Sequence, residues 1–330
     1  MPMTGLSGGV ARGLSGVALV TMIAIGTAGC SKMGMLKAMK AFKEANAAYQ
    51  QQDYRRSAEL YETTVQAGNY PELASAYFYL GNSYDNLYKP SKKGDAANDD
   101  LLNKAIKNYQ QAAEKLSAAG TKQEKDLGRL SLKYLVAAYG VDKLNDPSKA
   151  EPVVQRMIQL DPGEPENYFA LAKIYEDAGA YAEAEDVLVK AKEAKPNDPA
   201  VYMTLAGYYN RQGKFDKTIK ELEERAEKDP NNPEAHYTIS TFYWDEAFRD
   251  ASLKESEKRD YVQRGIGEID KALKIKADYT EALVYKGLLL RLQANLEKDP
   301  AKQQSLIKEA TVLRDRAEDL RKKKAAGVGD

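Results

Sequence analysis

Apolar side chains recur every three to four positions through most of the chain, separated by charged and polar residues. The stretch YFALAKIYEDAGAYAEAEDVLVKAKEAKPND, which begins at Tyr168, is typical. This spacing places the apolar residues along one stripe of an α-helix. Gly179 is expected to end the first helix of the stretch, and Pro196 a second helix over about 182–194. The pattern therefore predicts pairs of amphipathic helices joined by short turns.

The helix pairs recur with a period of 34 residues in the middle of the chain. Several residue classes share this period, and chance would not align them all. The sets that step by 34 are Pro162, Pro196 and Pro230; Leu171, Leu205 and Ile239; Ala172, Ala206 and Ser240; Tyr175, Tyr209 and Tyr243; and Tyr168, Tyr202 and His236. A single pair cannot bury its apolar stripe, so neighbouring pairs are expected to stack on one another.

The order of residues within a unit resembles the tetratricopeptide repeat: a large residue, Leu with Gly or Ala, Tyr, Ala, a second aromatic residue, Ala and Pro. The resemblance covers about residues 36–320 and is strong in the units that open near 77, 165 and 199. It implies an all-α fold, a right-handed superhelical solenoid of about seven helix pairs. Residues 321–330 are expected to form a polar C-terminal tail. Proteins of this family bind protein or peptide partners in the concave groove.

Three of the seven expected units carry extra polar residues between their two helices. The added stretches are KPSKKGDAANDDL, FRDASLKESEKRD and EKDPAKQQS. All three fall at the same kind of turn, so they are expected to lie on one edge of the stack. They either lengthen the helix pairs around a solvated tip or form a ridge that contacts a partner.

An uncharged, mostly apolar run, GLSGVALVTMIAIGTA at 13–28, leads to the only cysteine of the chain, Cys30. The run is shorter than the roughly 20 residues that a membrane span needs, and it fits the core of a secretory signal peptide. TAGC at 27–30 resembles the bacterial lipobox, whose cysteine receives a diacylglyceryl group and becomes the mature N-terminus. The resemblance implies a lipoprotein signal peptide at 1–29, lipidation of Cys30 and a lipidated tether at 30–35.

Two positions near the cysteine qualify this interpretation. Thr27 stands where the lipobox prefers Leu, Val or Ile. Ser31, in place of Asp, implies the outer membrane and a protein that faces the periplasm of the cell envelope.

Cleavage near Ala28 is one alternative and would release the protein. An uncleaved anchor is another, with the bulk in the cytoplasm, because more positive charge follows the run than Arg12 supplies before it.

The short tether places the first repeat near the membrane. Lys37, Lys40 and Lys43 follow the cysteine at helical spacing. They either meet anionic headgroups or form a solvated face of the first helix.

Composition argues against a catalytic or metal site. Lys and Arg total 49, as do Asp and Glu, so the basic excess of a nucleic-acid-binding protein is missing. One histidine and one cysteine are too few for a zinc site, and His236 takes a packing position in the repeat. The sequence contains no glycine-rich phosphate loop. We therefore expect a non-catalytic protein without a cofactor, and a cell-wall enzyme with an unrecognised site is the remaining alternative.

The first helix of every unit is expected to line the inner groove, where aromatic and Asn side chains suit an extended peptide or an inserted helix. The groove positions carry Phe42, Asn46, Tyr49, Phe78, Asn82, Asp85, Phe169, Lys173, Met203, Asn210, Tyr237, Thr241 and Trp244. Some groove-binding relatives hold a C-terminal carboxylate with a Lys/Arg/Asn clamp, which Asn46 and Asn82 match in part. Trp244, the only tryptophan, is expected to contribute most to binding. The alternative for each aromatic residue is packing between repeats.

Overall fold

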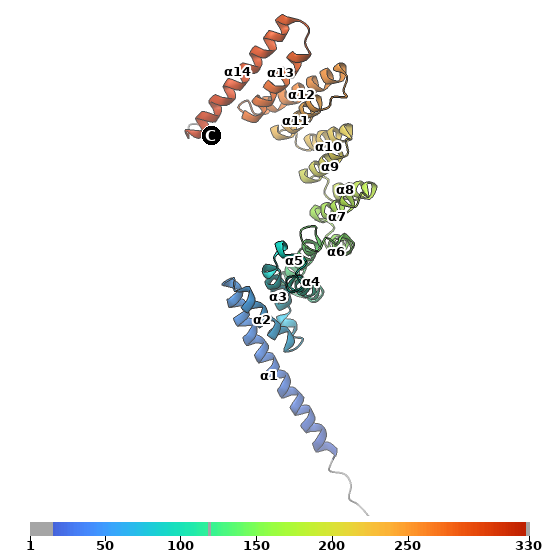
Figure 1. Cartoon of the computed structure of the whole chain (residues 1–330), viewed down its shortest axis with the longest axis vertical. Helices are drawn as coiled ribbons and strands as arrows, with labels where there is room; N and C mark the ends of the chain where they lie inside the picture. Colours follow the sequence, from blue (N-terminus) through green and yellow to red (C-terminus); the bar gives the residue numbers. More distant parts are fainter. Residues whose placement is uncertain (1–15, 118–119, 328–330) are drawn as a thin grey trace, which may run out of the picture. The chain divides into compact units, whose positions relative to one another are not determined.

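The computed structural model describes residues 16–117 and 120–327, and for 16–31 and 117 it describes the backbone alone. This part of the chain forms fourteen α-helices and two short 3₁₀ segments, with no β-strand among the described residues (Figure 1). The prediction of an all-α fold is confirmed. The chain divides between Leu160 and Asp161 into two compact units, called unit 1 and unit 2 below.

Unit 1 holds the first six α-helices and both 3₁₀ segments. They are α1 (Gly16–Gln50), α2 (Tyr54–Gln66), η1 (Pro71–Leu73), α3 (Ser75–Leu87), η2 (Pro90–Lys92), α4 (Ala96–Ser117), α5 (Lys122–Tyr139) and α6 (Pro147–Leu160). Consecutive helices pack as pairs, α1 with α2, α3 with α4 and α5 with α6. The pairs also contact their neighbours, since α2 packs on α3 and α4 packs on α5.

Unit 2 holds the other eight helices in four pairs. They are α7 (Pro165–Asp177), α8 (Tyr181–Ala194), α9 (Pro199–Arg211), α10 (Phe215–Lys228), α11 (Pro233–Arg249), α12 (Glu255–Ile275), α13 (Thr280–Leu296) and α14 (Pro300–Ala325). With the three pairs of unit 1, the described residues form seven helix pairs, the number that the repeat predicts.

The residues that recur every 34 positions begin and end the helices of unit 2. Pro199 and Pro233 are the first residues of their helices, where a fixed φ helps and a missing N–H costs nothing. The side chains of Asp198 and Asn232 cap these helices by accepting hydrogen bonds from backbone N–H groups. Gly179 has a φ of +75°, so it reverses the chain between α7 and α8 as its position in the repeat predicts.

Small and large side chains alternate in the core. Ala206 and Ala226 lie where helices approach closely, and both are buried. Ile239 and Tyr243 fill the wider spaces of the same cluster in unit 2. The repeating alanines and tyrosines of the sequence are therefore the core of the helix pairs, because each stripe meets the stripe of the next helix.

The helix boundaries differ from the sequence analysis at both ends. Helix α1 is already helical at Gly16, so it includes residues 30–35, which the sequence analysis placed before the first helix. The stretch contains no proline, and Gly34 lies so close to the Tyr70 ring that a Cβ would meet its hydroxyl at 2.7 Å. At the other end α14 continues to Ala325, because three lysines in its last turn favour the negative end of the helix dipole.

The extra polar residues of the sixth and seventh pairs lengthen their helices. Helix α11 has 17 residues and α12 has 21, against 13 and 14 in the α9–α10 pair. Helix α14 reaches 26 residues. The added residues thus extend existing helices around an exposed turn.

No helix in the described part has the length and hydropathy that a membrane span requires.

Candidate functional site

Unit 1 contains an open groove of about 520 Å³ between helices from three successive pairs. Its lining residues come from α1, α2, α3 and the start of α5: Phe42, Asn46, Tyr49, Gln50, Tyr61, Ser75, Tyr79, Thr121, Gln123, Glu124 and Leu127. Three of the residues predicted to line a groove, all on α1, lie together here. We call this surface the unit 1 groove.

Aromatic rings form the walls of the unit 1 groove. The ring of Phe42 meets that of Tyr61 edge-on, with 5.9 Å between centroids. Tyr79 contacts both Tyr49 and Tyr61, at 5.2 and 5.9 Å between ring centroids. Such contacts hold each ring in place, so the groove presents a rigid apolar surface before any partner arrives.

Asn46 is the polar centre of this surface. Its side-chain oxygen accepts a hydrogen bond from the Tyr61 hydroxyl. This contact fixes the orientation of the amide and leaves its nitrogen with no acceptor among the described residues. An Asn nitrogen supplies two donors, which suit the carbonyl groups of a peptide backbone.

Two tyrosines of the groove, Tyr49 and Tyr61, have raised pKa values and stay protonated over the physiological range. Burial, together with neighbouring tyrosines, raises the pKa of Tyr49 to about 12. Burial also raises the pKa of Tyr61 well above its ordinary value. Both hydroxyl groups therefore act as hydrogen-bond donors to asparagine, Tyr49 to the Asn82 side-chain oxygen at 2.6 Å.

The rim of the groove is fixed at the start of α5. Thr121 caps that helix, and the Glu124 carboxylate accepts a hydrogen bond from the Thr121 backbone N–H at 2.7 Å. This capping box orients the Glu124 carboxylate beside the groove. The rim therefore carries one acidic group whose position is set by the helix end.

Phe78, Asn82 and Asp85 lie behind the groove and do not line it, which corrects their assignment as groove residues. Phe78 is covered by the ring of Tyr134 from α5 at 5.7 Å. The Asn82 oxygen accepts from Tyr49 and Asn86, and its nitrogen donates to Tyr109 at 3.3 Å.

Asp85 pairs with Lys143 in the same interior region. Large side chains on the flanking helices close over this part of α3, which the repeat pattern of a single helix does not reveal. Because the Asn82 amide is bonded to Tyr49, Asn86 and Tyr109, it is not placed to hold the carboxylate of a partner.

In unit 2, Tyr237 and Trp244 of α11 meet on the ring of Tyr285 from α13. The ring centroids of these two residues lie 5.3 and 5.7 Å from that of Tyr285. Phe248 stacks on Trp244 at 5.0 Å and is itself 61% exposed. The half-buried Trp244 is thus at the edge of an aromatic cluster with an open side, and its contribution to binding stays a prediction.

The other predicted groove residues of unit 2 do not form one site. Lys173 is exposed and pairs with Asp177 on its own helix. Met203 packs against the core cluster of α10 and α11, and Asn210 is exposed. Phe169 and Thr241 are partly buried, and the Thr241 hydroxyl donates to the Thr238 carbonyl on its own helix.

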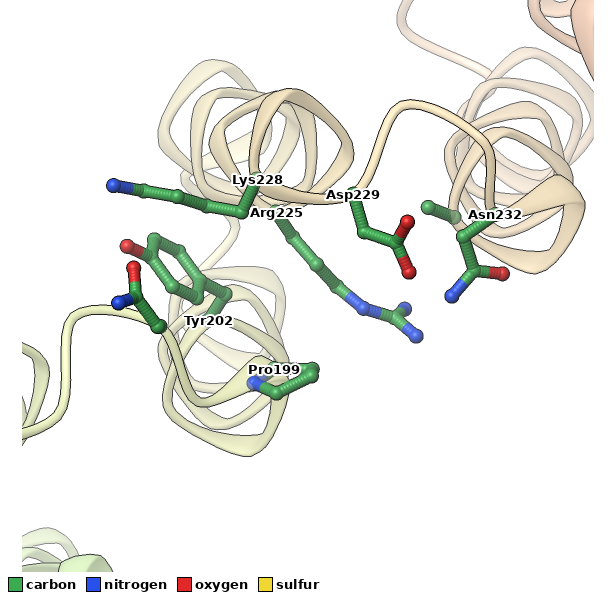
Figure 2. Close-up of a pocket in the computed structure, with 8 residues that line it drawn as sticks. Pro199, Tyr202, Arg225, Lys228, Asp229 and Asn232 are labelled. Atoms are coloured by element: carbon green, nitrogen blue, oxygen red, sulfur yellow. The ribbon is translucent and has the colours of Figure 1, made fainter.

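A smaller cavity of about 190 Å³ lies where α9, α10 and α11 meet in unit 2 (Figure 2). Arg225 extends from α10 toward Asn232, while Lys228 points to the Tyr202 side (Figure 2). The Arg225 side chain is 11% exposed, and its acidic partner Glu234 lies 3.8 Å away. With Arg225 and Lys228 as hydrogen-bond donors, this pocket has room for a small anionic group. The exposed carboxylate of Asp229 on its wall would repel such a group.

Sequence reasoning missed residues of the unit 1 groove, of the smaller cavity and of the aromatic cluster, each for a physical reason. Tyr61 and Arg225 belong to second helices, whereas the prediction counted first helices alone. Tyr79 follows Phe78 directly and takes the groove position that was assigned to it. Tyr285 is out of step with the 34-residue period because the α11–α12 pair is longer than a standard unit.

The single histidine has a structural partner. The His236 Nδ1 lies 2.8 Å from a Glu268 carboxylate oxygen, and both side chains are mostly buried. This agrees with a packed, hydrogen-bonded histidine. Within the described residues, no cluster of His, Cys, Asp or Glu has the arrangement of a metal site.

Comparison with known proteins identifies the repeat. Two sequence profiles of the tetratricopeptide repeat match residues 42–119 and 143–208. The search of curated proteins gave no match.

Solved structures similar to this chain include three TPR proteins or their parts, of which the first has a similar fold. The C-terminal part of a TPR repeat-containing protein from Cytophaga hutchinsonii is 16% identical, with a TM-score of 0.52 over 84% of this chain and 98% of that one. MamA from Desulfovibrio magneticus RS-1 is 13% identical, with a TM-score of 0.38 over 59% of this chain and 95% of that one. YrrB, a TPR protein with an unusual peptide-binding site, is 16% identical, with a TM-score of 0.37 over 61% and 91%.

The repeat matches and the helix pairs together define the class of protein. Residues 42–119 and 143–208 carry tetratricopeptide repeats, and proteins built from this repeat generally provide non-catalytic modules for protein interaction.

Proposed function

We propose that the protein is a non-catalytic, lipid-anchored scaffold that binds a peptide segment of a protein partner in the unit 1 groove. The observation that carries this proposal is the Asn46 amide, whose oxygen is held by Tyr61 and whose nitrogen remains available among the described residues. Aromatic walls supply apolar area for affinity, and the amide supplies a donor for the peptide backbone. The groove needs no cofactor for this role.

The anchor belongs to the same proposal. Its support is the uncharged run at 13–28, the TAGC sequence and the position of the only cysteine. Acylation of Cys30 would hold the protein on the envelope of a bacterium, with the outer membrane and the periplasmic side as the proposed location. A scaffold placed there supports the assembly of an envelope complex.

The anchor is tested by metabolic labelling with palmitate and by the mass of the mature N-terminus. We expect label on the native protein and an acylated N-terminal Cys30, and neither for a Cys30→Ser variant. Recovery of residues 1–29 on an unlabelled, membrane-bound native protein would instead support the uncleaved anchor. A soluble product that begins after Ala28 would support simple secretion.

The groove is tested by crosslinking in the native membrane. A photoreactive amino acid replaces Gln50, which is exposed and lines the groove. We expect a discrete crosslinked partner, and Asn46→Ala should weaken it about tenfold, since a lost peptide hydrogen bond costs about 1 kcal/mol or somewhat more.

The matched control is Asn108→Ala on α4, whose side chain is partly exposed, lies outside the groove lining and donates a hydrogen bond to the Lys104 carbonyl of its own helix. It should leave the crosslink unchanged. Equal crosslinking in the Asn46 variant would argue against peptide recognition in this groove.

A further inference from the structure

The part of α1 that follows Cys30 carries large apolar side chains on its outer face. Met33, Leu36 and Met39 are 75%, 68% and 51% exposed. They recur every third residue, so they form one oblique stripe along the helix. Among the described side chains of α1, at residues 32–50, no other large apolar side chain is exposed.

This stripe lies opposite the face that packs on the rest of unit 1. Ala38, Ala41 and Ala45 are buried, and their spacing turns them toward α2. At about 100° per residue, Leu36 is about half a turn away from the centre of that alanine seam. Packing within unit 1 therefore leaves the apolar stripe uncovered.

Positive charge surrounds the stripe. Four exposed lysines, Lys32, Lys37, Lys40 and Lys43, fall in the same two to three turns. None of them forms an ion pair with another described residue, and no acidic residue occurs before Glu44 in this stretch. A face that combines large apolar groups with lysines is typical of helices that lie in the interface of an anionic bilayer.

The position of the face favours a lipid surface over a protein. Cys30 precedes Met33 by three residues, a rise of about 4.5 Å along a helix. An acyl chain on that cysteine would bring the stripe to the headgroups without any further contact. A second copy of the same face is excluded as the occupant by the repulsion between the two sets of lysines.

We propose that the face of α1 formed by Met33, Leu36, Met39 and the four surrounding lysines lies flat on an anionic bilayer. The apolar side chains enter the boundary between headgroups and acyl chains, and the lysines meet the lipid phosphates. This inference rests on the proposed anchor for its location. It adds that the membrane orients unit 1, so that the protein is held by a helix face as well as by its lipid.

The test measures the depth of a nitroxide label in the bilayer. The label is placed at Leu36→Cys in the full, acylated protein, where Cys30 is not available for labelling. The protein is reconstituted in vesicles of phosphatidylethanolamine and phosphatidylglycerol. We expect the label about 5–10 Å below the headgroup surface, accessible to oxygen and protected from a water-soluble nickel chelate. The matched control is a label at Lys107→Cys, an exposed position on α4 that should remain in water.

A second variant separates the charge from the apolar stripe. Replacement of the four lysines by glutamine should raise the nickel accessibility of the position 36 label at least threefold, while the acylated mass of the N-terminus stays the same. The depth should also decrease from 50 to 500 mM salt, because the screening length falls steeply over that range.

Two other outcomes overturn the proposal. A position 36 label in water on vesicle-bound, acylated protein means that this face does not meet lipid. A label that is shielded in native membranes but not in vesicles means an acidic protein partner instead. The mass of the N-terminus reports the anchor separately. If it lacks acylation, the proposed anchor fails, and the label at position 36 in a Cys30→Ser background still reports on the face.

Discussion

Asn46 and Asn82 occupy equivalent positions in successive first helices, yet their amides have different environments. The Asn46 amide keeps its nitrogen toward an open groove. The Asn82 amide is enclosed, with its oxygen bonded to Tyr49 and Asn86 and its nitrogen to Tyr109. The same residue type therefore lines an open groove at one position and belongs to a buried hydrogen-bond network at the other, because the neighbouring side chains differ.

This contrast predicts different costs for the same substitution. Asn82→Leu would leave the hydroxyl groups of Tyr49 and Tyr109 without that partner in a buried region. We expect it to lower the free energy of unfolding by about 1–3 kcal/mol. Asn210→Leu, at an exposed position in unit 2, should change it by less than about 0.5 kcal/mol. Urea denaturation followed by circular dichroism measures both, and equal losses would contradict the buried network.

At the scale of helices, close approach is set by small residues at a few positions. A Cβ on Gly81 of α3 would lie 2.9 Å from the Tyr109 ring and 3.1 Å from the Ala105 carbonyl. The same addition on Gly267 of α12 meets nothing within 4 Å. One glycine is required by packing, whereas the other merely weakens its helix.

Alanine substitution should therefore have opposite effects at the two glycines. Gly81→Ala is expected to lower the free energy of unfolding by about 1–3 kcal/mol, because the α3–α4 pair must separate to admit a methyl group. Gly267→Ala should raise it by about 0.5–1 kcal/mol through helix propensity. Thermal unfolding of the two variants decides the matter, and stabilisation by both would contradict the packing of α3 on α4.

Charged contacts link neighbouring helices of unit 2. Glu185 of α8 accepts hydrogen bonds from Lys217 at 2.6 Å and from Tyr209 and Lys214 at 3.0 Å. These donors, Lys217 foremost, lower the pKa of the Glu185 carboxyl group to about 2, from an ordinary value of 4.5. A carboxylate with a lowered pKa stabilises the folded state above its unfolded pKa and loses that effect as the pH falls toward the folded value.

The pH dependence of unfolding follows from this sign. At pH 7, Glu185→Gln should lower the free energy of unfolding by about 1–2 kcal/mol, as expected for charge-assisted hydrogen bonds at a partly exposed site. The difference from the native protein should shrink between pH 4.5 and pH 2. Glu183→Gln, at an exposed position on the same helix, is the control and should have little effect. A constant difference across this pH range would rule out the ion-pair explanation.

The sequence predicts the helix pairs well because the apolar positions within each repeat determine which faces of its two helices pack together. The seven pairs and the turn at Gly179 follow from local periodicity, which also places Phe42, Asn46 and Tyr49 on one face of α1. Contacts between pairs are harder to predict. Tyr134 covers Phe78 from a helix more than fifty residues away, and the lengthened α11–α12 pair hides the alignment of Tyr285. Helical periodicity also places Met33, Leu36 and Met39 on one face but does not reveal that α2 leaves it exposed.

At the scale of the whole molecule, two compact units of helix pairs carry separate aromatic surfaces. Unit 1 presents the groove around Asn46, and unit 2 presents the cluster around Trp244. In the account proposed here, the N-terminal lipid and α1 hold unit 1 at a membrane while its groove takes a peptide.

The most direct test of that account is hydroxyl-radical footprinting of the protein with and without its crosslink-identified partner. Phe42 and Tyr79 line the groove, whereas the exposed Leu130 of α5 is not among its lining residues. We predict that the partner lowers the oxidation rate of Phe42 and Tyr79 severalfold and leaves that of Leu130 unchanged. Unaltered oxidation of both groove residues, with protection elsewhere on the protein, would contradict peptide binding in the unit 1 groove.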